Sequence, residues 1–262
     1  MALPKIDQPL YDLELPSTKQ PLKVRPMLAK EEKLLLMAKE SKDENDILGA
    51  IKQVVNNCIV TKNVDVDRFA IFDLEYLFLR LRAFSVSNLI DVHYRDNEDY
   101  NVMYNKLKAS GVPDQQADSE AFKHASYQFQ IDLNKVEVKF PDPEPDKMIQ
   151  VNDAITIRMR RPSASLYSNK QFLDADEKHK LDLLIFNCID AVVQDTTAVP
   201  FDKESLEDQV KFLADLPIPV MEKVREYLLQ QPNVNYEIKY TNKEGTERTI
   251  PFQSLNDFFT LR

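Results

Sequence analysis

Hydrophobic positions along the chain gather into short segments, and the most apolar of these predicts a buried helix over residues 72–85. Leu74, Leu77, Phe78 and Leu81 follow the i, i+3, i+4, i+7 spacing of one helix face. Other apolar residues continue around the sides of the helix, and few charged residues interrupt them. Because little of such a helix can face water, we expect other elements to surround it.

The segment before this helix predicts a β-hairpin followed by two helices. Residues 10–15 alternate between apolar and polar, and residues 22–26 resume after a turn bracketed by prolines. Residues 30–41 predict a helix with an acidic first turn, and Asp43 is a candidate N-cap for a second helix. Cys58 falls on the apolar stripe of the second helix, so we expect a buried, unreactive thiol.

The middle of the chain predicts strands around a polar segment. Residues 88–94 alternate like a strand, and the polar stretch 95–125 follows with a turn signal, SGVPD. We interpret this stretch as an insertion between two strands that is partly helical or mobile. Alternation then resumes, and the proline-rich connector 141–146 separates it from a second predicted hairpin, residues 149–159.

The last third predicts helices and a closing hairpin. Residues 181–189 carry an apolar helical face that includes Cys188, which we also expect to be buried. Asp202 is the candidate N-cap of the next helix, with Ser205 three residues further on. The chain then predicts a helix that proline stops, a hairpin and an apolar tail; these are residues 220–231, 235–252 and 255–261.

These elements predict an α+β fold with helices packed on antiparallel β-hairpins and with a polar insertion, because strands and helices do not alternate as βα units. We expect four segments, which can also form one continuous domain. They are an N-terminal hairpin with a three-helix lobe (1–94), the polar insertion (95–125), a β-rich middle segment (126–175) and a helical C-terminal lobe with the closing hairpin (176–262).

Composition narrows the function classes. The net charge of −9 argues against nucleic-acid binding, which needs lysine and arginine for phosphate contacts. Three glycines in 262 residues disfavour phosphate-cradling loops. Two cysteines far apart form no disulfide framework, no apolar run reaches the length of a membrane span, and residues 1–9 lack a signal peptide's apolar core. We therefore expect a protein of a reducing cytoplasm.

No catalytic or metal-binding set rises above background. His93, His124 and His179 are too scattered for a metal motif, and there is no Cys-x-x-Cys, GxSxG or phosphate-loop sequence. A carboxylate pair such as Asp132 with Asp153 is more often a solvated pair than an acid–base couple. The nearest approach to a metal site is the acidic cluster at 174–177 beside His179, which we interpret as the polar start of a helix. We expect no catalytic, cofactor-binding or metal residues.

The basic cluster of Arg158, Arg160 and Arg161 has two interpretations. A charged strand edge that discourages aggregation is the first. A surface for an acidic partner is the second.

Three stretches carry a family resemblance: residues 3–38 (LPKIDQPLYD to LLLMA), 57–88 (NCIVTKNVDV to AFSVSN) and 235–259 (NYEIKYTNKEG to NDFF). Together they resemble the baseplate hub family of T-even-like tailed bacteriophages. The resemblance implies a late, structural virion protein of the contractile tail that acts in hub assembly through contacts with other baseplate hub proteins. It implies no enzyme activity. The net charge and the lack of a membrane-length apolar run argue against nucleic acid and membrane as partners. The protein would lie in the host cytoplasm during assembly and in the tail baseplate if retained.

One departure from the family concerns the turn of the closing hairpin. Several relatives have a cysteine-containing turn that suggests a zinc knuckle, whereas residues 240–245 here read YTNKEG. We therefore predict no metal there and expect packing of Ile238, Ile250 and Phe252 to hold the hairpin. The candidate contact surfaces are the helical faces of 30–57 and the insertion 95–125, with the apolar tail as a third that we expect to pack on its own core.

Two alternatives to a retained hub subunit stay open. One is a transient hub assembly factor or chaperone that is absent from the mature virion. The other, more remote, is a metal-assisted cell-wall hydrolase, for which the sequence offers no acid–base or metal set.

Overall fold

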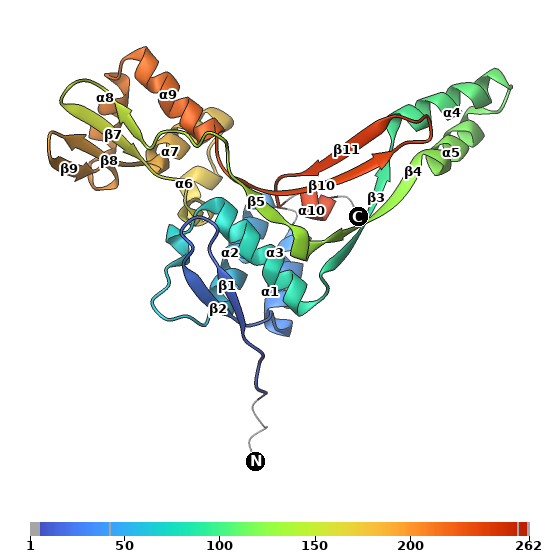
Figure 1. Cartoon of the computed structure of the whole chain (residues 1–262), viewed down its shortest axis with the longest axis horizontal. Coiled ribbons are helices and arrows are strands. Elements are labelled where there is room, and N and C mark those ends of the chain that lie inside the picture. The colour runs from blue at the N-terminus through green and yellow to red at the C-terminus, as the bar shows by residue number, and fades with distance from the viewer. Residues whose placement is uncertain (1–5, 42, 256, 261–262) are drawn as a thin grey trace. The chain divides into compact units, whose positions relative to one another are not determined.

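A computed structural model describes residues 6–41, 43–255 and 257–260 (Figure 1). The chain divides into two compact units, each built from two chain segments: unit 1 comprises residues 1–81 and 138–233, and unit 2 comprises residues 82–137 and 234–262. Small antiparallel sheets and packed helices make up both units, which confirms the predicted α+β fold.

The first segment of unit 1 contains a hairpin and helices, and its second segment contains a sheet and further helices. The elements of the first are β1 (Tyr11–Glu14), β2 (Pro21–Val24), α1 (Ala29–Ser41), α2 (Glu44–Cys58), η1 (Val66–Arg68) and α3 (Ile71–Ser85), which continues into unit 2. Those of the second are β6 (Met148–Gln150), β7 (Ile155–Met159), η3 (Ala164–Ser168), α6 (Lys170–Leu173), α7 (Glu177–Cys188), β8 (Ile189–Gln194), β9 (Thr197–Pro200), η4 (Phe201–Lys203), α8 (Leu206–Ala214) and α9 (Ile218–Leu229).

The helix α3 is the most apolar of unit 1, and its leucines are buried as the pattern predicts. Asp73 in its first turn is buried too. Its carboxylate accepts the Ser17 N–H at 3.0 Å and the Ser17 hydroxyl at 2.5 Å. Burial raises the pKa of Asp73, and the hydrogen bonds from Ser17 oppose that rise. This contact ties the turn of the β1–β2 hairpin to α3.

The predicted N-terminal elements are confirmed. β1 and β2 pair antiparallel, and the Asp43 side chain caps α2 by accepting the Asn45 N–H at 2.9 Å. Cys58 is fully buried, and burial raises the pKa of its thiol to about 11. A buried ion pair between Arg25 and Glu31, with Nη2 and Oε1 3.0 Å apart, joins the residue after β2 to α1.

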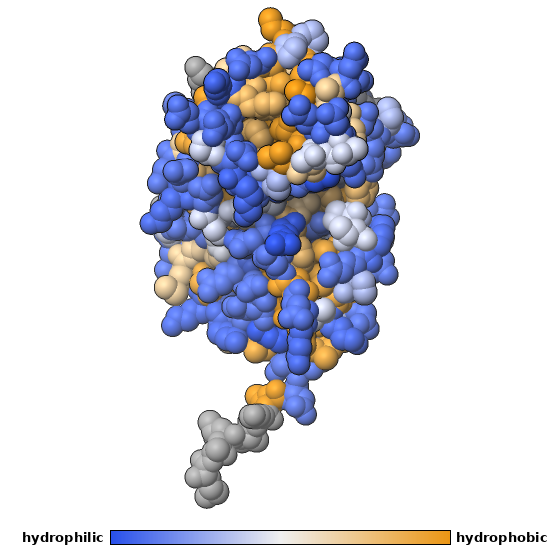
Figure 2. All heavy atoms as spheres, turned by 90° about the vertical axis from the view of Figure 1, so that its left-hand side faces the viewer, coloured by the Kyte–Doolittle hydropathy of each residue, from blue (hydrophilic) through white to orange (hydrophobic). Residues whose placement is uncertain are grey.

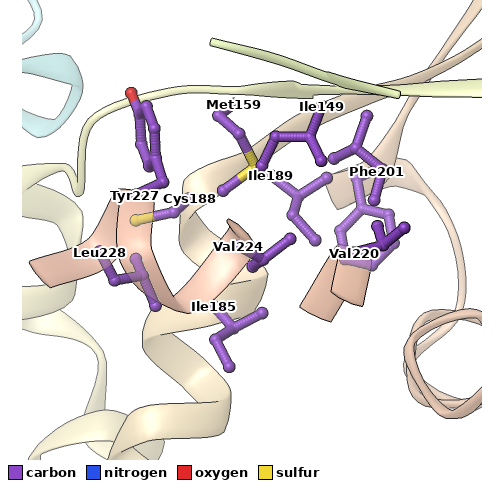
Figure 3. Close-up of a cluster of buried hydrophobic side chains, with 11 residues drawn as sticks. Ile149, Met159, Ile185, Cys188, Ile189, Phe201, Val220, Val224, Tyr227 and Leu228 are labelled. Atoms are coloured by element: carbon purple, nitrogen blue, oxygen red, sulfur yellow. The ribbon is translucent and has the colours of Figure 1, made fainter. Parts of the chain in front are cut away.

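The second segment of unit 1 forms a four-stranded antiparallel sheet in the order β6-β7-β8-β9. Side chains of β6 to β8, α7 and α9 form a buried cluster beneath it (Figure 3). Cys188 lies in this cluster as predicted, and burial raises the pKa of its thiol to about 12. The predicted hairpin over 149–159 corresponds to β6 and β7.

Three predictions about this region are wrong. Ile189, predicted to lie on the apolar helical face of residues 181–189, instead begins the strand β8, and β9 follows it. The N-cap of α8 is Ser205, whose hydroxyl accepts the Asp208 N–H at 3.1 Å, whereas Asp202 lies in the preceding turn η4. Leu181, expected on the apolar face of α7, is exposed. The first error arises because pairing with β7 and β9, which no local pattern shows, makes residues 189–194 a strand.

The basic cluster is not a strand edge, which corrects the first interpretation of it. Its strand, β7, lies between β6 and β8. Arg158 Nε is 2.6 Å from Asp190 Oδ2, and Arg160 Nη1 is 3.9 Å from the same carboxylate. Arg161 Nη2 is 3.2 Å from Glu144 Oε2. The guanidinium groups thus pair with carboxylates of the same unit.

Unit 2 contains two antiparallel ribbons and a helical hairpin. Its elements are β3 (Leu89–Arg95), α4 (Asn97–Ala109), α5 (Asp114–Ala125), β4 (Ser126–Asp132), η2 (Leu133–Lys135), β10 (Asn233–Thr241), β11 (Glu247–Phe252) and α10 (Asp257–Thr260), and the short strand β5 (Glu137–Lys139) begins at its boundary. β3 pairs with β4, and β10 with β11.

The polar stretch 95–125 forms the helical hairpin of α4 and α5, which extends from the β3–β4 ribbon (Figure 1). Ala117, Ala121 and Ala125 of α5 are fully buried, so the two helices lie close together. The expectation of a partly helical segment between two strands is confirmed.

Candidate protein-interaction site

The helix α8 carries apolar side chains on two sides. Phe212 and Leu213 pack against the buried cluster of unit 1. Leu206 and Val210, four residues apart and therefore on one face, point outward with 59% and 50% of their surface exposed. Ile218, at the start of α9, is 76% exposed. An amphipathic surface helix needs only one apolar face, so the outward face is in excess of what the fold uses.

The strand before α8 and the helix after it also carry exposed apolar side chains. All four residues of the edge strand β9 are exposed, among them Val199. We call Val199, Leu206, Val210 and Ile218 the α8 surface. Figure 2, which views the end of the molecule that carries α8 and β9, shows apolar side chains in its upper part surrounded by hydrophilic ones. Contiguous apolar area with a polar rim is typical of protein-interaction sites.

The charge around the α8 surface is acidic. Residues 202–215 contain five acidic residues and two lysines. The Ser205 hydroxyl caps the helix by accepting the Asp208 N–H at 3.1 Å, and it donates to Asp208 Oδ2 at 2.6 Å. Glu207 and Asp208 in the first turn suit the positive end of the helix dipole. A partner that covers the surface would therefore match it best with an apolar centre and a basic rim.

The contact surfaces predicted from sequence lie in different environments. On the helical faces of 30–57, the apolar stripe of α2 is buried, but Leu36 and Met37 of α1 are 55% and 59% exposed. In the apolar tail, Leu255 and Phe258 are buried, as expected for packing on its own core, whereas Leu261 lies outside the described residues. Sequence reasoning missed the α8 surface, although residues 206–218 hold more apolar side chains than one helix face can bury.

The residues considered for metal or acid–base chemistry have structural roles or lie in different units. Asp176 N-caps α7 by accepting the His179 N–H at 2.9 Å, and the His179 ring lies 2.8 Å from the same oxygen. Asp132 belongs to unit 2 and Asp153 to unit 1. Within the described ranges, no three His, Cys, Asp or Glu side chains are grouped so that they could hold a metal ion.

A polar network holds the turn of the closing hairpin β10–β11. Ile238, Ile250 and Phe252 are buried, as predicted. Beyond that packing, the buried carboxylate of Asp99 accepts the Lys243 N–H at 3.0 Å and the Tyr127 hydroxyl at 2.5 Å.

The neighbouring carboxylate of Asp96 extends this network. Asp96 accepts the Tyr240 hydroxyl at 2.6 Å. Burial raises the pKa of Asp96, but the hydrogen bonds from Tyr240, the Asp99 N–H and Asn242 outweigh this and lower it. Acidic residues at the start of α4 thus bind the turn of the closing hairpin.

Comparisons with known proteins identify a family. A family model described as T4 bacteriophage base plate protein matches residues 8–260, nearly the whole chain. No curated protein and no solved structure matches the chain. The match confirms the resemblance at the level of T4-like baseplate proteins, while membership of the hub stays a prediction. None of the helices among the described residues is long and apolar enough to span a membrane.

Proposed function

The chain belongs to the T4 bacteriophage base plate protein family, and on that premise we propose that it is a structural subunit of the central baseplate hub, held there by protein contacts. Family membership gives a structural role in the baseplate, with other baseplate proteins as partners. Assignment to the hub of a contractile tail, and a role without enzyme activity, are the parts that we propose.

The α8 surface carries the proposal. Its side chains Leu206, Val210 and Ile218 leave apolar area exposed that a subunit in an assembly would cover. We assign to this surface a neighbouring hub protein with an apolar patch rimmed by lysine or arginine, because the residues around α8 are mainly acidic. The resemblance of residues 3–38, 57–88 and 235–259 to hub proteins favours the hub over other parts of the baseplate.

Quantitative mass spectrometry of intact tails tests the proposal. Tails are purified from the encoding phage and dissociated into the central hub and the peripheral parts of the baseplate. A hub subunit is expected at a few copies per tail, in the hub fraction. Presence in the peripheral fraction alone would contradict the hub assignment.

If purified tails lack the protein although their assembly requires its gene, the second candidate, a transient assembly factor, is favoured. The α8 surface suits that role equally, because a chaperone also binds through exposed apolar area. Metal analysis of the purified protein separates both from the hydrolase alternative. Stoichiometric zinc would reopen that alternative and contradict a closing turn held by Asp99 and packing alone.

A further inference from the structure

A cleft of about 460 Å³ lies in unit 1 between the edge strand β6 and the helix α9, and the residues that line it do not include those of the α8 surface. One wall is Met148–Gln150 with the connector that precedes it. The other wall is one face of α9, from Lys223 through Tyr227 to Gln230. The proposed function uses none of these residues.

The backbone of β6 offers hydrogen-bonding groups to this cleft. β6 is the edge strand of its sheet, and within the described part of the chain it pairs only with β7. Met159 N–H donates to Lys147 O, and Val151 N–H donates to Ile155 O, so the hydrogen-bonded pairs with β7 fall at odd-numbered residues of β6. Met148 and Gln150 consequently point their backbone groups away from β7. Asp146 accepts the Met148 N–H at 2.8 Å, which leaves the Met148 carbonyl and the Gln150 amide directed outward.

A buried hydroxyl marks the opposite wall. Tyr227 is 1% exposed, and its hydroxyl has no hydrogen-bond partner among the described residues. Figure 3 shows this oxygen pointing away from the aliphatic side chains of the cluster. A buried hydroxyl without a partner is energetically unfavourable, so this oxygen is a candidate group for contact with a ligand.

The charged residues that line the cleft indicate the class of ligand that it binds. Glu144, Asp146 and Glu226 line it, against Lys223 as the one basic side chain among the described lining residues. Glu144 is paired with Arg161. Asp146 and Glu226 each accept one hydrogen bond through one oxygen, from the Met148 N–H and from Gln230 Nε2 at 3.1 Å, and neither forms an ion pair among the described residues. Carboxylate oxygens and a phenol oxygen are acceptors that suit a lysine or arginine side chain.

We propose that this cleft binds an extended segment of a partner protein by strand addition to β6. The segment pairs with the outward backbone groups of Met148 and Gln150. It places a basic side chain between Asp146, Glu226 and the Tyr227 hydroxyl. Main-chain hydrogen bonds provide the affinity in this mode of recognition, and the side-chain pocket provides the specificity. The inference goes beyond the proposed function and holds or fails independently of hub membership.

Selection from a peptide library tests the inference. The purified full-length protein is screened against displayed random peptides of about seven residues, which is the length of a strand. The Gln150→Pro variant serves as counter-selection, because proline removes the outward N–H while an edge strand tolerates it. A synthetic peptide with the selected consensus is then titrated by fluorescence anisotropy. The proteins compared are the wild type and the variants Gln150→Pro, Tyr227→Phe and Glu226→Gln.

The expected consensus contains lysine or arginine flanked by β-forming residues. Gln150→Pro is expected to weaken binding at least tenfold, and Tyr227→Phe and Glu226→Gln about fivefold each. Tyr236→Phe, a tyrosine outside the cleft, is the matched control and leaves affinity unchanged. Circular dichroism verifies that each variant is folded, and Glu226→Gln keeps the test decisive if Tyr227→Phe does not fold.

Three results would overturn the inference. The first is that selection on the wild type enriches no peptides that the Gln150→Pro variant fails to enrich. The second is a consensus without lysine or arginine, and the third is that the folded variants bind the peptide with the same affinity as the wild type.

Discussion

Replacement of Asp99 by alanine is expected to release the turn of the closing hairpin. The Asp99 carboxylate is fully buried and accepts three hydrogen bonds, from the Tyr127 hydroxyl at 2.5 Å and from the N–H groups of Lys243 and Glu244 at 3.0 and 3.3 Å. Each hydrogen bond to a charged group contributes about 1.5–3 kcal/mol, and such contributions are not additive. Because water can reach part of the opened site, we expect a cost of about 3–5 kcal/mol.

Hydrogen exchange measures this effect where it occurs. In Asp99→Ala, the backbone N–H groups of residues 242–246 are expected to exchange much faster, because their opening costs less free energy. Urea unfolding followed by circular dichroism gives the change in stability of the whole protein. Asp91→Ala is the matched control. Asp91 is an exposed carboxylate in the same unit with one hydrogen bond, from Gln130 at 3.2 Å, and we expect a change within about 0.5 kcal/mol.

A double-mutant cycle with Tyr127→Phe separates the hydroxyl contact from the backbone contacts. A coupling energy of about 1–3 kcal/mol between positions 99 and 127 is expected. The reasoning is refuted if Asp99→Ala costs less than about 1 kcal/mol and leaves exchange in the turn unchanged. Packing of Ile238, Ile250 and Phe252 would then hold the hairpin without help from the network.

Three further predictions concern the thiols, the acid range and a helix cap. Burial raises the pKa of Cys58 to about 11 and of Cys188 to about 12, so a thiol reagent should label neither in the folded protein and both in urea. Folding lowers the pKa of Asp96. The ionised carboxylate therefore stabilises the fold fully above the usual pKa of 3.8, and this stabilisation is lost as the pH falls through the folded-state pKa. Unfolding midpoints measured below pH 5 should consequently depend less on pH in Asp96→Asn than in the wild type. Ser205→Ala should cost about 1 kcal/mol in thermal unfolding and Asp202→Ala under about 0.5 kcal/mol, and the reverse order would contradict the cap.

Local sequence signals predicted the elements that local interactions determine. The Asp43 side chain caps α2 by accepting the N–H of Asn45, only two residues further along the chain. The alternation of apolar and polar residues in β3 and β4 matches their antiparallel register. Residues 72–85 are apolar around most of the helix circumference, so the helix has no polar face to turn to water and must be buried. In each of these cases the determining pattern lies within one element or one hairpin.

The errors arise where distant residues decide the outcome. The apolar run from Ile189 continues the helical pattern of α7, and short apolar runs fit a strand or a buried helix equally well. Pairing with β7 on one side and β9 on the other makes it a strand.

The network at the closing turn, the α8 surface and the cleft depend on contacts that the sequence does not reveal. Asp96 and Tyr240 are 144 residues apart, so no local pattern links them. The periodicity of α8 shows that it has apolar residues, but packing against Phe201 and its neighbours decides which of them face inward. Tyr227 lies on the core face of α9, and only the structure shows that its hydroxyl has no hydrogen-bond partner among the residues described.

The central claim, that the chain enters the baseplate through the α8 surface, is tested most directly by incorporation of a surface variant. A phage lacking the gene is complemented with Leu206→Asp/Val210→Asp, and copies per purified tail are counted by quantitative mass spectrometry. The control, Leu36→Asp/Met37→Asp, changes an equally exposed apolar pair on α1. Two carboxylates buried in an apolar contact should lower incorporation at least about tenfold, while the control incorporates like the wild type. If the α8 variant is incorporated at the same number of copies per tail as the wild type, the claim is contradicted. If only the α1 variant is lost from tails, the contact lies on α1 instead.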